Sequence, residues 1–471
     1  MEQQLLYKKI ANIVENQIKN GSLVYGDRLP SVRSAQKLYN VSLNTAKSAY
    51  MELESRSLIE SRPKSGYFVS RSGLRRMAIP SISTFKIDEK KQDPAALIDK
   101  VFHSLEDKEI TRFSLGLPSA SLLPIQKLNR CIIESVHDLH DYGDQYGQVQ
   151  GSPSLRKEIA KWSLVLEGKI SDEDLIITSG AMNAIYSCLR AVTKPGDTIA
   201  VESTLYFGFI QAFQLLGLKT IEIPTHPITG IELDALKKVI HKIDVCCFVT
   251  NFSNPLGALM PDEHKKELVK LLAHYHIPLI EDDLYGNIYF GSSRPKPCKY
   301  FDEEGLVMWC GSFTKVLAPS FRLGWVEPGQ YKDKILKQKL IQTISQPAIY
   351  QEAVSKFLQI GRYDHHLNSF RKKLYSNYVN FRNSIEAHFP ENTKMSQPEG
   401  GFVLWLELDA KIDSTMLYDY ALRQKLSFAP GRMFTQHDQF KNCIRLNYAV
   451  DWNEKTAQDL MRLGRFFKAV L

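Results

Sequence analysis

One lysine stands among small hydroxyl-bearing residues, directly after an apolar stretch with the pattern of a strand. The stretch covers residues 306–310, and Gly311-Ser312-Phe313-Thr314-Lys315 follows it. A lysine at the end of a strand can have a lowered pKa and can form a Schiff base with a carbonyl group. The alternative is a solvated lysine without a chemical role, which is the usual state of a single lysine.

Acids and a phenol follow another apolar stretch, 276–280, in the sequence Glu281-Asp282-Asp283-Leu284-Tyr285. A buried carboxylate there would keep a pyridine nitrogen protonated and make the ring an electron sink, whereas consecutive acids are otherwise surface charge. Residues 178–182 stand between a strand and a helix, where free backbone N–H groups can hold a phosphate, or form an ordinary turn. The turn-rich stretch 251–257 could direct the Asn254 amide at a ring substituent, or be only a loop.

All these stretches follow strands of one predicted domain. Beyond residue 110, short apolar segments alternate with helical patterns; the segments are 174–178, 198–201, 245–250, 279–281 and 306–310. Such alternation predicts an α/β domain with a mainly parallel sheet. Because functional groups of such sheets cluster at the strand ends, we expect these motifs to form one site.

Residues 1–70 have a different pattern. The spacing of apolar residues predicts a helix over 5–20; Ser31 can cap a helix that runs to residue 39, and Ser42 one that runs to about residue 55. Residues 58–60 and 66–69 predict two strands around the basic turn 62–65. This order is typical of a winged helix-turn-helix, whose second short helix enters the major groove.

The positive charge of the chain is concentrated in the same region. Residues 1–76 contain 13 Lys and Arg against 6 Asp and Glu, so +7 of the formal net charge of +8 lies there. A basic module on a neutral body predicts a nucleic-acid partner, and a solvated basic face is the alternative. The stretch 71–110, which contains Arg71, Arg75, Arg76, Pro80 and the charged run 88–91, predicts a linker with one helix near 94–105.

Composition bounds the remaining possibilities. A chain of 471 residues predicts two or three folding units, and 44% hydrophobic with 24% charged residues excludes disordered and fibrous classes. No signal peptide or apolar run of about 18 residues is found, which predicts a cytoplasmic protein. Seven cysteines, of which only Cys246 and Cys247 are close together, predict neither a disulfide framework nor a metal site.

One segment of the N-terminal region resembles the GntR family of bacterial regulators along its whole length. Its sequence is LYKKIANIVENQIKNGSLVYGDRLPSVRSAQKLYNVSLNTAKSAYMELESRSLIESRPKSGYFV. The resemblance implies that a set of residues faces DNA: Ser31, Arg33, Ser42, Asn44, Thr45 and Lys47. Ser31, Thr45 and Lys47 suit phosphates, while Arg33 and Asn44 can read base edges; helix capping or exposure to solvent is the alternative for each. Leu43 stands where the family commonly has Arg, so a guanine contact is lost or replaced by an apolar one.

In their order, the later motifs resemble the fold-type-I PLP enzymes of the aspartate aminotransferase superfamily over residues 111–471. The resemblance implies a large α/β domain and a smaller C-terminal α+β domain, with Lys315, Asp282 and Tyr285 as catalytic residues. Lys315 would carry pyridoxal 5'-phosphate (PLP) as an internal aldimine, and Asp282 would contact its pyridine nitrogen. The other implied cofactor-binding residues are Tyr206, Asn254 and Tyr285 at the ring and Ala181, Met182, Ser312, Arg322 and, from a second subunit, Tyr146 at the phosphate. Arg445 and Gly116 would bind a substrate's carboxylate.

Together, the two resemblances are those of the MocR/GabR subfamily of GntR regulators. They predict a homodimeric, PLP-dependent regulator with domains over 1–70 and 111–471, which binds double-stranded DNA and senses an amine, an amino acid or a B6 vitamer through aldimine chemistry at Lys315. One alternative is a working aminotransferase with an accessory DNA-binding head, which multiple turnovers with one pair of amino acid and 2-oxo acid would favour. Another is a cofactor-free scaffold.

Overall fold

The computed structural model describes residues 6–20, 22–24, 26–56, 58–62, 65–70, 77–84, 93–104, 107, 109–139, 145–162, 170–291 and 293–471. The chain divides into two compact units, Met1–Ala78 with Val379–Ala387, and Ile79–Tyr378 with His388–Leu471. Residues 63 and 64 of the predicted basic turn, and 71–76 and 85–92 of the predicted linker, lie outside the described residues. The predicted linker helix corresponds to α4 (Ala95–Ser104).

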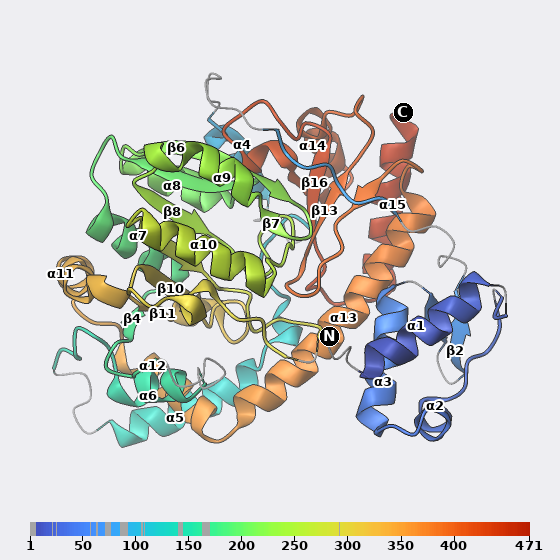
Figure 1. The fold of residues 1–471 in the computed structure, drawn as a ribbon, viewed down its shortest axis with the longest axis horizontal. Helices are drawn as coiled ribbons and strands as arrows, with labels where there is room; N and C mark the ends of the chain where they lie inside the picture. Colours follow the sequence, from blue (N-terminus) through green and yellow to red (C-terminus); the bar gives the residue numbers. More distant parts are fainter. Residues whose placement is uncertain are drawn as a thin grey trace. The chain divides into compact units, whose positions relative to one another are not determined.

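The first unit contains the predicted winged helix-turn-helix (Figure 1). Its helices are α1 (Leu6–Lys19), α2 (Val32–Leu38) and α3 (Leu43–Ser55), followed by an antiparallel hairpin of β1 (Ile59–Arg62) and β2 (Gly66–Val69). Ser31 caps α2 by accepting a hydrogen bond from the Ser34 amide at 3.1 Å, and Ser42 caps α3 by accepting one from the Thr45 amide at 3.0 Å. Each hydroxyl satisfies an N–H group that the helix leaves without a partner.

The core of this unit fixes which face of α3 is exposed. Ala46, Tyr50 and Leu53 are buried against α1 and the hairpin, and the Tyr50 hydroxyl donates a hydrogen bond to the Pro30 carbonyl at 2.7 Å. Because buried residues recur every three or four positions, the intervening Asn44 and Lys47 point outward and are exposed. The α3 face opposite the core is therefore polar and basic.

The second unit is built on an eight-stranded sheet, which confirms the predicted α/β class with a mainly parallel sheet. In spatial order its strands are β4 (Ile176–Thr178), β11 (Gly324–Glu327), β10 (Val307–Ser312), β9 (Leu279–Asp282), β8 (Val245–Phe248), β5 (Thr198–Ser203), β6 (Lys219–His226) and β7 (Gly230–Ile231). β11 is antiparallel to β4 and β10, β7 is antiparallel to β6, and the other pairs are parallel.

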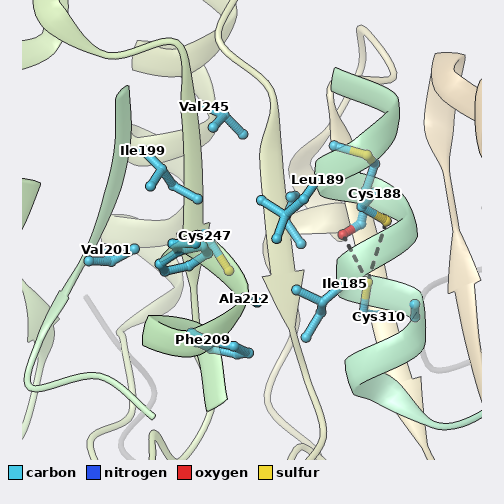
Figure 2. Packing of buried hydrophobic residues seen from close by; sticks show 14 of the residues in the cluster. Ile185, Cys188, Leu189, Ile199, Val201, Phe209, Ala212, Val245, Cys247 and Cys310 are labelled. Atoms are coloured by element: carbon cyan, nitrogen blue, oxygen red, sulfur yellow. Dashed lines mark hydrogen bonds between the residues drawn. The ribbon is translucent and has the colours of Figure 1, made fainter. Parts of the chain in front are cut away.

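Helices cover both faces of this sheet (Figure 1). The helices α7 (Ala181–Val192), α8 (Phe207–Leu215) and α11 (Lys332–Gln342) pack on one face, and α9 (Leu233–Val239) and α10 (Asp262–His274) pack on the other. Figure 2 shows the first of these two cores, where Ile185, Leu189 and Phe209 surround buried cysteines. The Cys188 and Cys310 sulfur atoms lie 3.9 Å apart, and all seven cysteines are buried thiols.

A second, antiparallel sheet lies in the C-terminal part of the unit. Its order is β12 (Lys394–Met395), β13 (Val403–Glu407), β16 (Cys443–Asn447) and β15 (Ala429–Pro430). The remaining helices and strands are α5 (Ile125–Asp138), α6 (Pro153–Trp162), α12 (Ala348–Gln359), α13 (Arg362–His388), α14 (Ser414–Arg423), α15 (Glu454–Ala469), β3 (Thr111–Arg112) and β14 (Leu426–Ser427). Within the described part of the chain, no helix is both long and apolar enough to span a bilayer.

One close backbone approach holds β11 against the beginning of α7. A Cβ atom at Gly324 would lie 2.7 Å from the Gly180 carbonyl carbon and 2.8 Å from the Gly311 oxygen. These neighbours are backbone atoms, which cannot move away as the end of a side chain can. Only glycine at position 324 therefore permits this contact between β11, β10 and α7.

We expect Gly324→Ala to lower the free energy of unfolding of the second unit by about 1–3 kcal/mol, because the added methyl group overpacks the contact. Urea denaturation followed by circular dichroism measures the change. Gly291→Ala is the matched control, since no described atom would lie within 4 Å of its Cβ, and we expect a change below about 0.5 kcal/mol. Equal effects of the two substitutions would contradict the proposed packing constraint.

Candidate functional site

The predicted motifs meet in one cavity at the carboxyl ends of β8, β9 and β10. The cavity has a volume of about 160 Å³. It is lined by Ala181, Met182, Tyr206, Val249, Asn254, Asp282, Leu284, Tyr285, Ser312, Thr314, Lys315 and Arg322. The strands are parallel, so residues that follow them share one edge of the sheet, as the sequence predicts.

The three consecutive acids at the end of β9 are all buried, but they have different partners. Glu281 accepts hydrogen bonds from the Thr250 hydroxyl at 2.5 Å and from two amides of the turn at residues 298 and 299. Asp283 forms an ion pair with Arg294 and accepts a hydrogen bond from the Trp309 indole at 2.8 Å. The Asp282 side chain lines the cavity instead, so its surroundings differ from those of Glu281 and Asp283.

Burial governs the acidity of Asp282. The side chain is 7% exposed and accepts a hydrogen bond from the Leu284 amide at 3.0 Å. Burial raises the pKa of Asp282 to about 7, and the negative charge of Asp283 adds to the rise. A positively charged group placed in the cavity would restore the ionised carboxylate.

Lys315 extends from the loop after β10 into the same cavity. Its Nζ donates a hydrogen bond to the Gly116 carbonyl at 2.6 Å. Burial and, to a smaller extent, the neighbouring positive charge of Arg445 lower the pKa of Lys315 to about 8. The amine is therefore closer to its neutral, nucleophilic form at neutral pH than a solvated lysine is.

Arg445 is a buried cation without an acidic partner. The side chain is 1% exposed, donates hydrogen bonds to the Ser114 carbonyl and, at 3.1 Å, to the Asn254 side-chain oxygen, and leaves its Nε atom without a partner. Among the described residues, no carboxylate forms an ion pair with Arg445, and burial lowers its pKa to about 10. A Cβ atom at Gly116 would lie 3.4 Å from its Nη1 atom, so Gly116 stands between Lys315 and Arg445.

Tyrosines and an asparagine form the walls. Tyr285 is 3% exposed and is hydrogen-bonded to the Asn254 side chain, and burial raises the pKa of Tyr285. Tyr206 lies over the cavity with its ring 5.6 Å from that of Phe209. Burial also raises the pKa of Tyr206, so both phenols stay protonated at neutral pH.

Another part of the cavity lining presents donors that suit an anion. The helix α7 begins there, with Gly180 at a φ of 87° and the free amides of Ala181 and Met182 following. Arg322 lies over Gly180, its Nη2 donates to the Ser179 carbonyl at 3.2 Å, and its side chain is exposed. The Ser312 hydroxyl lies within hydrogen-bonding distance of two acceptors, the Thr314 hydroxyl at 2.7 Å and the Leu323 carbonyl at 2.8 Å, so its single proton is less available to an anion than the sequence suggests.

This set of groups fits pyridoxal phosphate. The beginning of α7 and Arg322 offer donors that would suit its phosphate, Asp282 is a buried carboxylate that would suit its pyridine nitrogen, and Lys315 is an amine of lowered pKa that would suit its aldehyde. The donors suit an anion, and the buried carboxylate suits a protonated ring nitrogen.

Other predicted site residues lie outside the cavity. The Tyr146 side chain is 82% exposed and is not among the lining residues. Arg33, Ser42, Asn44 and Lys47 are exposed on the first unit, while Ser31, Ser42 and Thr45 also make the capping contacts described above. The structure thus leaves the predicted DNA-contacting side chains accessible.

Sequence reasoning missed several residues that position the site. Thr314 lines the cavity, although only its neighbours in the same motif were given roles. A Cβ atom at Gly208 would lie 2.5 Å from the Tyr206 ring, so this glycine permits the ring's position. Asn447 donates to the Leu117 carbonyl at 2.8 Å and so holds the segment that contains Gly116. Gly208 directly follows two aromatic residues, which could have indicated a close contact with a ring. Asn447 is far in sequence from the segment that contains Gly116, so no local pattern indicated its role.

Comparison with known proteins supports this assignment in both units. Residues 6–69 match the family of bacterial regulatory proteins named gntR, and residues 124–461 match the family of class I and II aminotransferases. The matches cover the helix-turn-helix and the cavity, respectively. They confirm both resemblances that the sequence motifs indicated.

Individual relatives align either with nearly the whole chain or with most of it. The HTH-type transcriptional regulators YdcR and YjiR of Escherichia coli are 33% and 34% identical; the alignments cover 98% and 97% of this chain and 99% and 98% of those proteins. The solved structure of the α-aminoadipate aminotransferase LysN of Thermus thermophilus, in complex with N-(5'-phosphopyridoxyl)-L-leucine, has a TM-score of 0.73 and 26% identity and covers 79% of this chain and 95% of its own. The chain belongs to the GntR-type regulators whose helix-turn-helix domain is fused to a class I and II aminotransferase domain, the arrangement of MocR-like regulators.

Proposed function

We propose that the protein binds duplex DNA through its first unit and that PLP in the second unit makes this binding responsive to an amino acid. The observation that carries the proposal is the buried guanidinium of Arg445, which has no acidic partner among the described residues and lies close to Lys315. A buried charge requires a counter-charge. An amino acid supplies a carboxylate for Arg445 and an amine that can compete with Lys315.

The residues of the cavity would each hold one part of the coenzyme. When bound, PLP supplies an aldehyde that reacts with amines and a pyridine ring that withdraws electrons. Lys315 would hold it covalently, Asp282 would keep a proton on the ring nitrogen, and Tyr206 would lie against the ring face. Asn254 and Tyr285 would donate hydrogen bonds to the ring oxygen.

The phosphate would lie at the beginning of α7. The Ala181 and Met182 amides, Arg322 and, through reorientation of its hydroxyl, Ser312 would donate to it. The partial positive charge of a helix N-terminus favours such an anion. The non-polar Met182 side chain leaves the backbone contact intact.

The protein would act as a homodimer in which Tyr146 reaches the phosphate of the other copy. An exposed group of apolar side chains supports this arrangement: Leu340, Ile341, Ile344 and Ile349 are 37–74% exposed. The loop that carries Tyr146 is next to them, because a Cβ atom at Gly147 would lie 3.6 Å from the Ser345 Cβ. Apolar side chains gathered in this way are typical of a protein–protein interface.

DNA binding would use the exposed face of α2 and α3. Ser31, Thr45 and Lys47 would position the phosphates, while Arg33 and Asn44 would contact base edges. Ser42 would donate to DNA when Thr45 is the donor in the hydrogen bond between their hydroxyls, which leaves the helix cap in place. Regulation requires that the amino acid binds with different affinity to the DNA-competent and the DNA-incompetent state, so the ligand must change the equilibrium between them.

The rate at which PLP becomes attached to the apoprotein should depend on pH through Lys315. The neutral amine is the nucleophile and its pKa lies at about 8, so the rate should fall about tenfold for each pH unit below 8 and level off above it. Stopped-flow absorbance of the bound coenzyme measures the rate. Lys315→Ala should give no bound band, whereas Lys337→Ala, which removes an exposed lysine of α11, should behave as wild type. A profile without this inflection would count against the role of Lys315.

Arg33→Ala should weaken binding to duplexes selected from a randomised library by about 1–3 kcal/mol, because the guanidinium can contact a base edge in two places. The PLP content should not change. Arg130→Ala removes an equally exposed arginine from α5 of the second unit and is the control. Fluorescence anisotropy measures both affinities, and equal affinities for the two variants would argue against Arg33 as a DNA contact.

A further inference from the structure

Residues 79–84, which we call the strap, belong to the predicted linker but are anchored on the second unit. Pro80 and Ser83 are buried, and Ser83 is 9% exposed. The strap follows the end of the hairpin at Val69 along the chain, so it is the described part of the second unit that lies next in sequence to the helix-turn-helix. Its contacts therefore bear on how a change in one unit reaches the other.

Ser83 takes the place of a backbone hydrogen bond between β5 and β6. Ser203 pairs with Pro224 at the end of this parallel ladder, where the Thr225 amide would bond to the Ser203 carbonyl. Instead, the Ser83 hydroxyl donates to the Ser203 carbonyl at 2.9 Å and accepts from the Thr225 amide at 3.1 Å. The two strands are thus joined through the strap at this point.

The neighbouring rung is bridged in the same way, but from within the sheet. The Ser203 amide donates to the Thr225 hydroxyl at 3.1 Å, and this hydroxyl donates to the Ile223 carbonyl at 2.9 Å. The strands are therefore separated by one hydroxyl group on each side of the pair. Because the second bridging hydroxyl belongs to the strap, its removal leaves a buried donor and a buried acceptor without their partner.

Residues on both sides of Ser83 contact the part of the unit that contains the antiparallel sheet. The Ser81 amide donates to Glu407 of β13 at 2.6 Å, and the Ser81 hydroxyl accepts from Lys394 of β12 at 2.8 Å. The Thr84 amide and hydroxyl donate to the side chain of Gln439, which precedes β16, at 3.1 and 3.0 Å. The strap is hydrogen-bonded to both sheets of the unit at once.

Each anchor is close to a residue of the proposed site, Tyr206 of the cavity wall or the buried Arg445. Ser203 is followed closely by Tyr206, which lines the cavity, and the intervening Leu205 amide donates to the Phe434 carbonyl at 2.9 Å. In the antiparallel sheet, β13, which carries Glu407, pairs with β16, which carries Arg445. A shift of β16 relative to the end of β5 would therefore change the distance between the contacts of Ser83 and those of Ser81 and Thr84.

We propose that the strap transmits the state of the cavity to the helix-turn-helix unit. A carboxylate bound by Arg445 changes the position of the antiparallel sheet relative to the end of β5. The strap is hydrogen-bonded to both, so its position changes too, and with it the point at which the chain that leads to the hairpin is attached to the second unit. This inference rests on the proposed function, because it assumes a carboxylate ligand and a DNA-binding unit. It adds the route by which one affects the other.

The test uses the full-length protein with N-(5'-phosphopyridoxyl)-L-alanine, an unreactive adduct of coenzyme and amino acid, and a duplex selected from a randomised library. In the wild type, the adduct should change duplex affinity by at least about fivefold and should change the hydrogen-exchange rates of the Ser81 and Thr84 amides. Ser83→Ala and Glu407→Gln should bind the adduct and the duplex separately with wild-type affinity but lose most of the fivefold coupling.

Ile82→Ala is the matched control, because this side chain of the strap is 45% exposed and the change removes none of the anchors. It should keep the wild-type coupling. Wild-type coupling in both Ser83→Ala and Glu407→Gln, or unchanged exchange of the strap amides, would overturn the proposal while leaving the two binding sites in place. Failure of the wild type to bind the adduct or the duplex would instead refute the proposed function. If Ser83→Ala loses affinity for the adduct, the coupling in Glu407→Gln decides.

Discussion

The buried positive charge of Arg445 is the constraint on which the site depends. Two cations, Lys315 and Arg322, and one carboxylate, Asp282, line the cavity, and the guanidinium of Arg445, whose charge acts on Lys315, is 1% exposed. Burial lowers the pKa values of both Lys315 and Arg445, and for Lys315 the positive charges of Arg445 and Arg322 add to this effect. A phosphate at the beginning of α7 and a carboxylate at Arg445 would balance these charges, so the folded cavity favours a ligand with both kinds of anion.

The sequence predicted five of the eight strands of the central sheet, because these strands are short, continuous apolar segments followed by motifs. The end of β10, with Ser312 and Lys315, is a clear case. The strands β6, β7 and β11 were not predicted. β6 contains Glu222 and Pro224, which interrupt the apolar pattern, and β11 is a short antiparallel strand that packs through glycine at position 324. Their places in the sheet are set by contacts distant in sequence.

The site shows the same division. The resemblance selected Asp282 from three consecutive acids, whereas the residues alone could not, because Arg294, Trp309 and Thr250 bind the other two from elsewhere in the chain. In the first unit, Ser31 and Ser42 were correctly placed as helix caps, since capping is a local interaction. The strap has no periodic pattern, and its partners Ser203 and Glu407 are far away in sequence, so nothing local could have revealed its anchoring.

In the proposed function, occupancy of the cavity and the affinity for DNA are energetically coupled. The most direct test is reciprocal: the affinity of the PLP-loaded protein for the common L-amino acids is measured from the coenzyme's absorbance, with and without a saturating duplex selected from a randomised library. If an amino acid changes DNA affinity, the duplex must change the affinity for that amino acid by the same factor, and we predict a factor of at least about five. Amino-acid affinities that are identical with and without bound DNA would contradict the proposed coupling.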